Sequence, residues 1–128
     1  MQTQSTPETY QHTSPAGAEV RLLMNNEQGG MAHCTLKANT VSRAVRHHTV
    51  SEFWYVLSGS GAIWRRENNE EQITTLTPGV SIDIPLGCDF QYRSDNADLV
   101  FICVTLPPWP GADEASYVKK GAWAPTVK

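Results

Sequence analysis

Short apolar segments separated by turn-forming residues are the feature that most restricts what this chain can fold into. No stretch longer than ten residues carries apolar residues at the spacing of an amphipathic helix. Turn-forming groups such as Thr77-Pro78-Gly79 instead interrupt the chain at short intervals. Many short strands at regular spacing are typical of a sandwich or barrel, so we predict an all-β protein. The expected strands are residues 20–24, 31–38, 52–57, 62–66, 72–76, 80–84, 90–93 and 99–106.

The length of the chain indicates a single domain with one core, because 128 residues lies in the usual size range of one domain. We expect a flexible N-terminal arm over residues 1–18 and a barrel over residues 19–106. Residues 107–128 are expected to form a tail that packs on the barrel or on a partner subunit. Trp109 and Trp123 favour this docked tail, since exposed tryptophan side chains are costly.

Charge and composition exclude several classes of partner. The net charge is −3, from 10 basic and 13 acidic residues, so no excess of Lys and Arg is available to bind nucleic acid. No window is long and apolar enough to span a bilayer, and we expect no secretory signal at the N-terminus. The three cysteines are widely spaced and form no ligand cluster, which predicts reduced thiols and a cytoplasmic location.

Residues 46–61, with the sequence RHHTVSEFWYVLSGSG, combine a histidine pair, a glutamate, an aromatic strand and a glycine turn. His48 lies four positions before Glu52, and six residues separate Glu52 from Gly59. This spacing resembles the first conserved motif of the cupin superfamily. The chain departs from that motif at Arg46, which stands where the family has its first histidine.

A second cupin-like motif follows, in which Gly79, Pro85 and Gly87 have the family's spacing. Phe90 and Ser94 occupy the positions where that motif has histidine and asparagine. The resemblance implies a double-stranded β-helix, also called a jelly-roll cupin barrel, with a pocket inside the barrel. The glycine and proline framework of the two motifs is intact, whereas most of the ligand framework is not.

The resemblance implies a metal site that this chain fills only in part. A typical cupin site uses three histidines and one glutamate, a set that suits Fe, Mn, Ni or Zn. The motif positions here offer only His48 and Glu52, which predicts a degraded site without a tightly bound divalent metal. Uninterrupted alternation along the strand places His48 on the face of Glu52. A bulge would bring His47 inward instead, and His47, His33 or Asp89 could complete an unusual site.

The other predicted pocket residues are aromatic or basic. Trp54, Phe90 and Tyr92 share the inward face of their strands, and Trp64 is a further candidate for the pocket wall. Arg46 could bind a carboxylate or a phosphate in a bidentate manner, or it could equally pair with Glu52 as an internal ion pair. We therefore expect a small-molecule ligand, anionic or aromatic, that contacts Arg46, Trp54, Trp64 and Phe90. Alternatively, the aromatic side chains simply fill the barrel.

Phe53, Tyr55 and Leu57 alternate with the inward residues of the same strand and are expected on its outer face. The outer face of an antiparallel sheet is normally polar. Three large apolar residues there indicate a covered surface, so we predict a homodimer formed through this sheet.

Two classes of function follow from these residues. The favoured one is a small-molecule-binding protein, either a sensor or an accessory subunit, that uses no metal. The alternative is an enzyme, of which one version resembles metal-dependent cupin dioxygenases or isomerases that would use His48 and Glu52. Another version resembles metal-free sugar isomerases and epimerases, with His48 as the base and Tyr92 or Glu52 as the acid.

Overall fold

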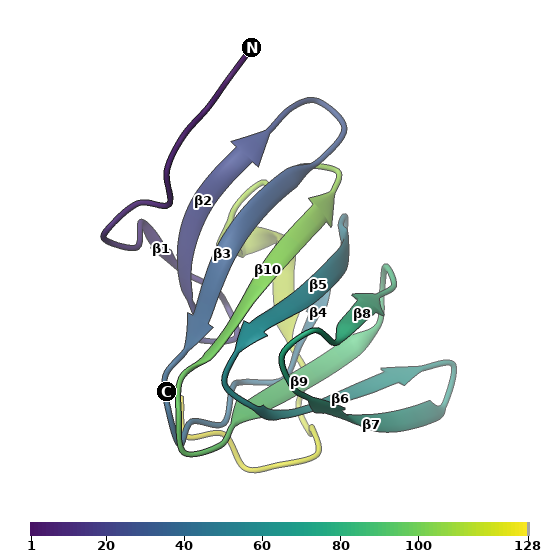
Figure 1. Ribbon diagram of the computed structural model, residues 1–128. Helices are drawn as coiled ribbons and strands as arrows, with labels where there is room; N and C mark the ends of the chain where they lie inside the picture. The colour runs from purple at the N-terminus through teal and green to yellow at the C-terminus, as the bar shows by residue number, and fades with distance from the viewer. Residues whose placement is uncertain (128) are drawn as a thin grey trace.

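The computed structural model describes residues 1–127 and confirms the predicted all-β fold. Two antiparallel sheets pack against each other, and the described residues contain no α-helix (Figure 1). Helical structure in this range is limited to a single 3-10 turn, η1 (Ala112–Glu114). Within the same range, no helix has the length and apolar character needed to cross a membrane.

Over residues 1–127, eleven strands make up the two sheets. In chain order they are β1 (His12–Thr13), β2 (Glu19–Asn25), β3 (Gly30–Leu36), β4 (Val45–His47), β5 (Ser51–Ser58), β6 (Gly61–Glu67), β7 (Glu70–Leu76), β8 (Ser81–Ile84), β9 (Asp89–Ser94), β10 (Leu99–Leu106) and β11 (Ala115–Tyr117). The first sheet has the order β1-β2-β3-β10-β5-β8, and the second has the order β11-β4-β9-β6-β7. Strands far apart in sequence are therefore neighbours, as a jelly roll requires.

Side-chain alternation places the core between the two sheets. Along β10, Leu99, Phe101 and Cys103 are buried, while the residues between them are only half-buried. The core residues contributed by the second sheet include Val45, Ile63 and others that face the first sheet. Because side chains of a strand point alternately to opposite faces, each sheet supplies one inner face to this core.

The glycine that closes the first motif has a structural cause. Gly59 follows β5 with a φ of +76°, a conformation that L side chains rarely adopt. A Cβ at this position would also lie 2.0 Å from the carbonyl oxygen of Asp98. The turn between β5 and β6 therefore needs glycine, whatever the protein binds.

Both chain ends contact the barrel. Within the expected arm, His12 and Thr13 pair with β2, and Ala16 and Ala18 are buried in the core. The barrel thus begins several residues before residue 19, because these small side chains fill space between the sheets. In the tail, β11 pairs with β4.

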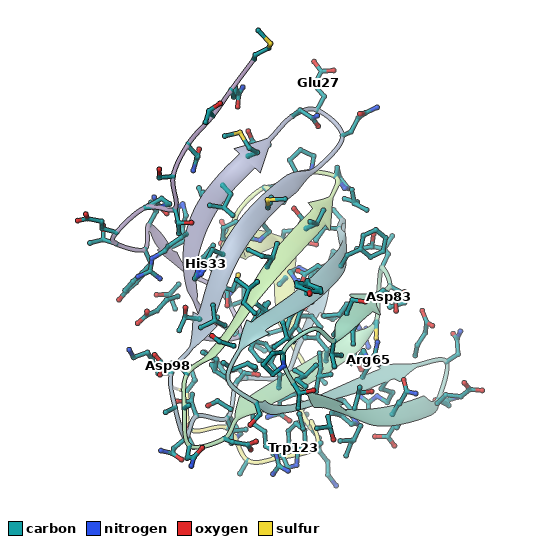
Figure 2. All side chains as sticks on the ribbon, viewed as in Figure 1. Glu27, His33, Arg65, Asp83, Asp98 and Trp123 are labelled. Atoms are coloured by element: carbon teal, nitrogen blue, oxygen red, sulfur yellow. The ribbon has the colours of Figure 1, made fainter. Side chains whose placement is uncertain are left out.

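The end of the tail covers the outer face of the second sheet. In the view of Figure 2, the side chain of Trp123 lies below this sheet. The buried side chain of Gln91 on β9 donates to the carbonyl oxygen of Trp123 at 2.8 Å and accepts from its amide at 3.0 Å. The guanidinium of Arg93 lies over the Trp123 ring, 4.6 Å from its centroid. These contacts attach the tail to its own barrel.

Candidate functional site

A cavity of about 260 Å³ lies between the two sheets. Its wall includes the aromatic side chains of Trp54, Phe90, Tyr92 and Phe101. His47 and Glu52 add a polar group to this lining, and the cavity extends toward Trp109 and neighbouring residues of the tail. A concave, mostly apolar space with a few convergent polar groups is the usual form of a ligand site.

Glu52 is held inside the barrel by the alternation of β5 and by three donors. It shares the buried face of β5 with Trp54, whose indole Nε1–H donates to Glu52 Oε1 at 2.7 Å. The thiol of Cys103, on the adjacent strand β10, donates to the same oxygen at 3.2 Å. His47 Nε2 lies 2.7 Å from Glu52 Oε2. A buried carboxylate with three donors is a well-satisfied anion, which is how such a group is tolerated in a core.

The prediction that His48 faces the interior is wrong, because His47 takes that place. Along β4 the burial alternates, with Val45 and His47 buried and Arg46 exposed. Residues 48–50 leave the strand before β5 begins, so the alternation of β5 does not continue that of β4. The side chain of His48 is exposed to solvent. The metal and catalytic roles expected for His48 therefore have no geometric support.

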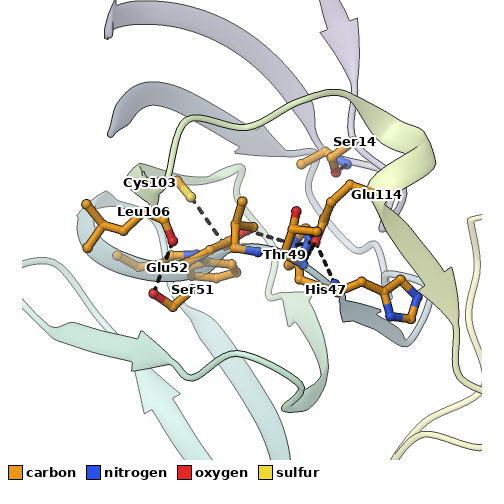
Figure 3. A network of polar contacts seen from close by, with 12 residues as sticks. Ser14, His47, Thr49, Ser51, Glu52, Cys103, Leu106 and Glu114 are labelled. Carbon is orange, nitrogen blue, oxygen red and sulfur yellow. Dashed lines mark hydrogen bonds and ion pairs between the residues drawn. The ribbon is translucent and has the colours of Figure 1, made fainter. Parts of the chain in front are cut away.

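A third ionisable group, Glu114 of η1, completes the polar cluster (Figure 3). Its Oε2 pairs with His47 Nδ1. Its Oε1 accepts hydrogen bonds from the backbone amides of His48 and Thr49, both at 2.6 Å, and from that of Val50 at 3.3 Å. Successive amides that point at one anion form a backbone nest. The tail therefore places the carboxylate of Glu114 against the turn between β4 and β5, where it also orients the imidazole of His47.

The two carboxylates on either side of His47 determine its charge. A neutral imidazole has only one N–H, whereas both ring nitrogens of His47 face a carboxylate. Burial lowers the pKa of His47, but the hydrogen bonds and charges of Glu52 and Glu114 outweigh it and raise this pKa to about 9. Burial raises the pKa of each glutamate, yet His47 and the surrounding donors hold both pKa values below their ordinary value. At neutral pH His47 is a cation between two anions.

Two residues expected in the pocket lie outside it. Arg46 Nε binds Asp89 Oδ1 at 2.6 Å on the outer face, and Arg66 Nη2 binds the other carboxylate oxygen at 2.7 Å. Arg46 therefore cannot hold a ligand inside the barrel, because β4 turns its side chain to solvent. Trp64 is buried but lies on the outer face of β6, where its Nε1–H donates to Glu71 at 2.8 Å. It does not line the cavity.

The other predicted aromatic residues do line the cavity. Trp54 stacks on Phe101 with ring centroids 3.8 Å apart, and Tyr92 meets Trp54 edge-on at 4.9 Å. Phe90 stacks on the imidazole of His47 at 5.6 Å. Burial raises the pKa of Tyr92 well above its ordinary value, so its phenol stays protonated. Among the described residues, no hydrogen bond joins Tyr92 to His47 or Glu52.

The residues at the motif's ligand positions match a metal site poorly. With His47 as the second ligand, Val45 takes the position of the first histidine, and Phe90 takes that of the third. Val45 and Phe90 are register partners on β4 and β9, so two hydrocarbon side chains stand together where imidazoles would be needed. Both nitrogens of His47 already face carboxylates. Over residues 1–127, no group of three or more His, Cys, Asp or Glu is arranged to hold a metal ion.

The residues suggested as additional ligands do not reach the cavity. His33 lies opposite Ile102 on the outer face of the first sheet (Figure 2). Asp89 is occupied by Arg46 and Arg66 on the outer face of the second sheet. Of these candidates only His47 points inward, and it cannot by itself complete the set around Glu52.

Sequence reasoning missed Glu114 altogether. It lies 62 positions after Glu52, in a segment whose prolines and small residues indicate only irregular structure. Nothing in its immediate neighbours distinguishes it from the exposed Asp113 beside it. The contact of Cys103 with Glu52 follows only from the pairing of β10 with β5. No local signal marks either contact, because both depend on which strands become neighbours.

Comparisons with known proteins find similarity in structure only. No protein-family profile matches the sequence, and no curated protein matches it. Among solved structures, the capsular polysaccharide assembling protein CapF from Staphylococcus aureus aligns with a TM-score of 0.69 and 20% identity over 80% of this chain. Oxalate decarboxylase from Bacillus subtilis aligns with a TM-score of 0.74 and 14% identity over 87%. BH2720 from Bacillus halodurans aligns with a TM-score of 0.65 and 16% identity over 83%.

The extent of these alignments limits what they establish. The alignment covers 32% of CapF and 30% of oxalate decarboxylase, so this chain spans about a third of the length of each. It covers 78% of BH2720. At such low identity a shared structure establishes architecture and leaves activity open. CapF and oxalate decarboxylase are both cupin-fold proteins, and this chain has the cupin fold, a jelly-roll barrel with its cavity between two antiparallel sheets.

Proposed function

We propose that the protein binds a small organic molecule inside the barrel and that its site holds no resident metal. The observation that carries this proposal is the combination of an aromatic cavity with a polar cluster at its wall. Val45 and Phe90 replace two expected ligands, and His47 is held between Glu52 and Glu114. In this reading the imidazolium occupies the place where a metal cation would neutralise Glu52. A cytoplasmic location fits the three free cysteines.

Elemental analysis tests the metal-free part of this proposal. Untagged protein purified without chelator is expected to contain Fe, Mn, Ni and Zn only far below one atom per chain. The physical reason is that two hydrocarbon side chains and a protonated imidazole offer a divalent ion no adequate ligand set. A near-stoichiometric metal that disappears in Glu52→Ala would contradict the proposal. Glu71→Ala, which changes a carboxylate on the outer face, is the matched control and should leave the metal content unchanged.

A second candidate function is acid–base catalysis without a metal. It is favoured by the contact between His47 and Glu52, two buried groups with displaced pKa values on the wall of one cavity. The roles expected for His48 would then belong to His47. Glu52→Gln distinguishes the two functions, because a binding protein should have no catalytic turnover to lose. A turnover that Glu52→Gln abolishes while the circular dichroism spectrum is unchanged would favour the enzyme.

We further propose a homodimer formed through the outer face of the first sheet. Phe53, Tyr55 and Leu57 on β5 are 53%, 50% and 43% exposed. Ile102 and Val104, half-buried on the neighbouring strand β10, pair with Tyr55 and Phe53 and extend this apolar surface. An apolar surface of this kind on a soluble domain commonly marks an interface. A second copy would present the same uncharged strip, which suits a self-complementary contact.

Sedimentation analysis tests the dimer. The wild-type protein is expected to sediment as a dimer at micromolar concentration, and Phe53→Glu is expected to sediment as a monomer, because it would bury a charge in the interface. Ile73→Glu is the matched control, since Ile73 is 60% exposed on β7 of the other sheet. The control should remain dimeric. A monomeric wild-type protein, or dissociation by Ile73→Glu alone, would contradict this interface.

A further inference from the structure

We infer that the cavity selects a small apolar or aromatic amine, bound as a cation beside Glu52, and that it rejects carboxylates and phosphates. This inference rests on the proposed binding function and narrows its ligand class. It replaces the expectation of an anionic ligand, which depended on Arg46 facing inward. Three features carry it: the net charge of the polar cluster, the composition of the cavity wall, and the unused acceptor capacity of Glu52.

The charge of the cluster follows from its geometry. His47 touches Glu52 through one ring nitrogen and Glu114 through the other, so each contact must contain one proton. Two shared protons among one imidazole and two carboxyl groups leave a net charge of −1. This result is the same whether the second proton is on the imidazole or on a carboxyl group. The cluster is therefore anionic as a unit.

Among the described residues that line the cavity, no lysine or arginine offsets this charge. The histidines of this wall are His47, which belongs to the cluster, and His12, an exposed residue that meets Trp109 edge-on. Arg46, the neighbour of His47 in the sequence, is engaged with Asp89 on the outer face together with Arg66, and the guanidinium of Arg43 lies over the ring of Tyr117. An anionic ligand would therefore enter a poorly solvated space beside a like charge, which is costly at short range. A cation would compensate the charge that the cavity already holds.

Glu52 retains a place for a ligand's donor. A carboxylate offers about four acceptor sites on its two oxygens. Trp54 and Cys103 occupy two of them at Oε1, and His47 occupies one at Oε2. Because the N–H of Trp54 and the thiol of Cys103 both donate to Glu52, neither is free to donate to an anionic ligand. The wall next to Glu52 thus presents an acceptor, which suits an ammonium group.

The aromatic walls and the size of the cavity define the rest of the ligand. Cations bind favourably over aromatic faces, and more strongly where water is excluded. Trp54, Phe90 and Tyr92 line the same cavity as Glu52. An apolar cavity of ~150 Å³ accommodates benzene, so 260 Å³ leaves room for one ring with a short chain. A primary amine on a single aromatic ring matches this description.

Three ligands of one shape and different charge test the inference. Full-length protein would be titrated with 2-phenylethylamine, 2-phenylethanol and 3-phenylpropionate at pH 7.5, with the indole N–H signal of Trp54 as the NMR readout. The amine is expected to bind about tenfold more tightly than the alcohol or better, since desolvated cation–π contacts reach such strengths. The carboxylate is expected not to shift the Trp54 signal.

Two variants test whether a preference for the amine depends on the carboxylate of Glu52. In Glu52→Gln the amine is expected to bind less than about threefold more tightly than the alcohol. The reason is that loss of the charge should remove at least half of the free energy that corresponds to a tenfold preference. Glu70→Gln, at an exposed position of β7, should keep the wild-type preference. The comparison within the wild-type protein stands even if Glu52→Gln fails to fold. Equal or tighter binding of the alcohol or the carboxylate would overturn the amine inference and leave the binding function intact. Failure of all three to bind would overturn both.

Discussion

Replacing Glu114 with alanine is expected to lower the free energy of unfolding by about 3–5 kcal/mol, the range found when one partner of a buried charge pair is removed. The carboxylate satisfies three backbone amides of the β4–β5 turn and pairs with His47 Nδ1. Its loss leaves a buried imidazole without one of its partners and exposes the nest of amides. Urea denaturation with linear extrapolation would measure the change.

Two further variants separate the contributions of Glu114. Glu114→Gln keeps an oxygen for the amides but loses the charge, so we expect a smaller loss of about 1–2 kcal/mol. Asp113→Ala changes the exposed neighbouring carboxylate and should stay within about 0.5 kcal/mol of the wild-type protein. Equal effects of Glu114→Ala and Asp113→Ala would mean that the tail does not hold His47 in place.

Raising the pH from 6.5 to above 9 is expected to lower the free energy of unfolding by roughly 3 kcal/mol through His47 alone. Other groups that titrate in this range add their own contributions. The pKa of His47 is raised from 6.5 to about 9, and each tenfold change in proton affinity corresponds to about 1.4 kcal/mol. A group with a raised pKa binds its proton more tightly in the folded state. Its contribution is therefore complete below pH 6.5 and is lost as the pH rises through about 9.

The acidic side of the pH profile has the opposite sign. The pKa values of Glu52 and Glu114 are lowered by folding from 4.5. Their contribution is present above about pH 4.5 and is lost as the pH falls through the lowered values. The cluster therefore stabilises the protein most between these two limits, from about pH 4.5 to 6.5.

Unfolding experiments on histidine variants test the pH dependence. Denaturation of His47→Gln across the alkaline range should give a flatter profile than that of the wild-type protein. His48→Gln is the matched control, because the neighbouring histidine is exposed and should leave the profile unchanged. A His47 imidazole that titrates near its ordinary pKa in an NMR experiment would contradict the prediction.

The sequence by itself determined the architecture of this protein. Gly59, with its left-handed backbone and its close approach to Asp98, has a local cause that any chain with this turn must satisfy. The period-two alternation of β5 placed Glu52 and Trp54 inside and Phe53 and Tyr55 outside, as the structure confirms. Turn residues and alternation are short-range properties, so they can be interpreted without knowing which strands pair.

The composition of the candidate site was decided by the tertiary structure. The irregular residues 48–50 between β4 and β5 broke the alternation, which exchanged His48 for His47 and turned Arg46 toward Asp89. No pattern in the sequence indicates that residues 48–50 interrupt the alternation of inward and outward side chains. Glu114 reaches His47 only because β11 pairs with β4 and brings the tail over the turn. The charge of the site thus depends on contacts between distant segments, and these exist only once the sheets have assembled.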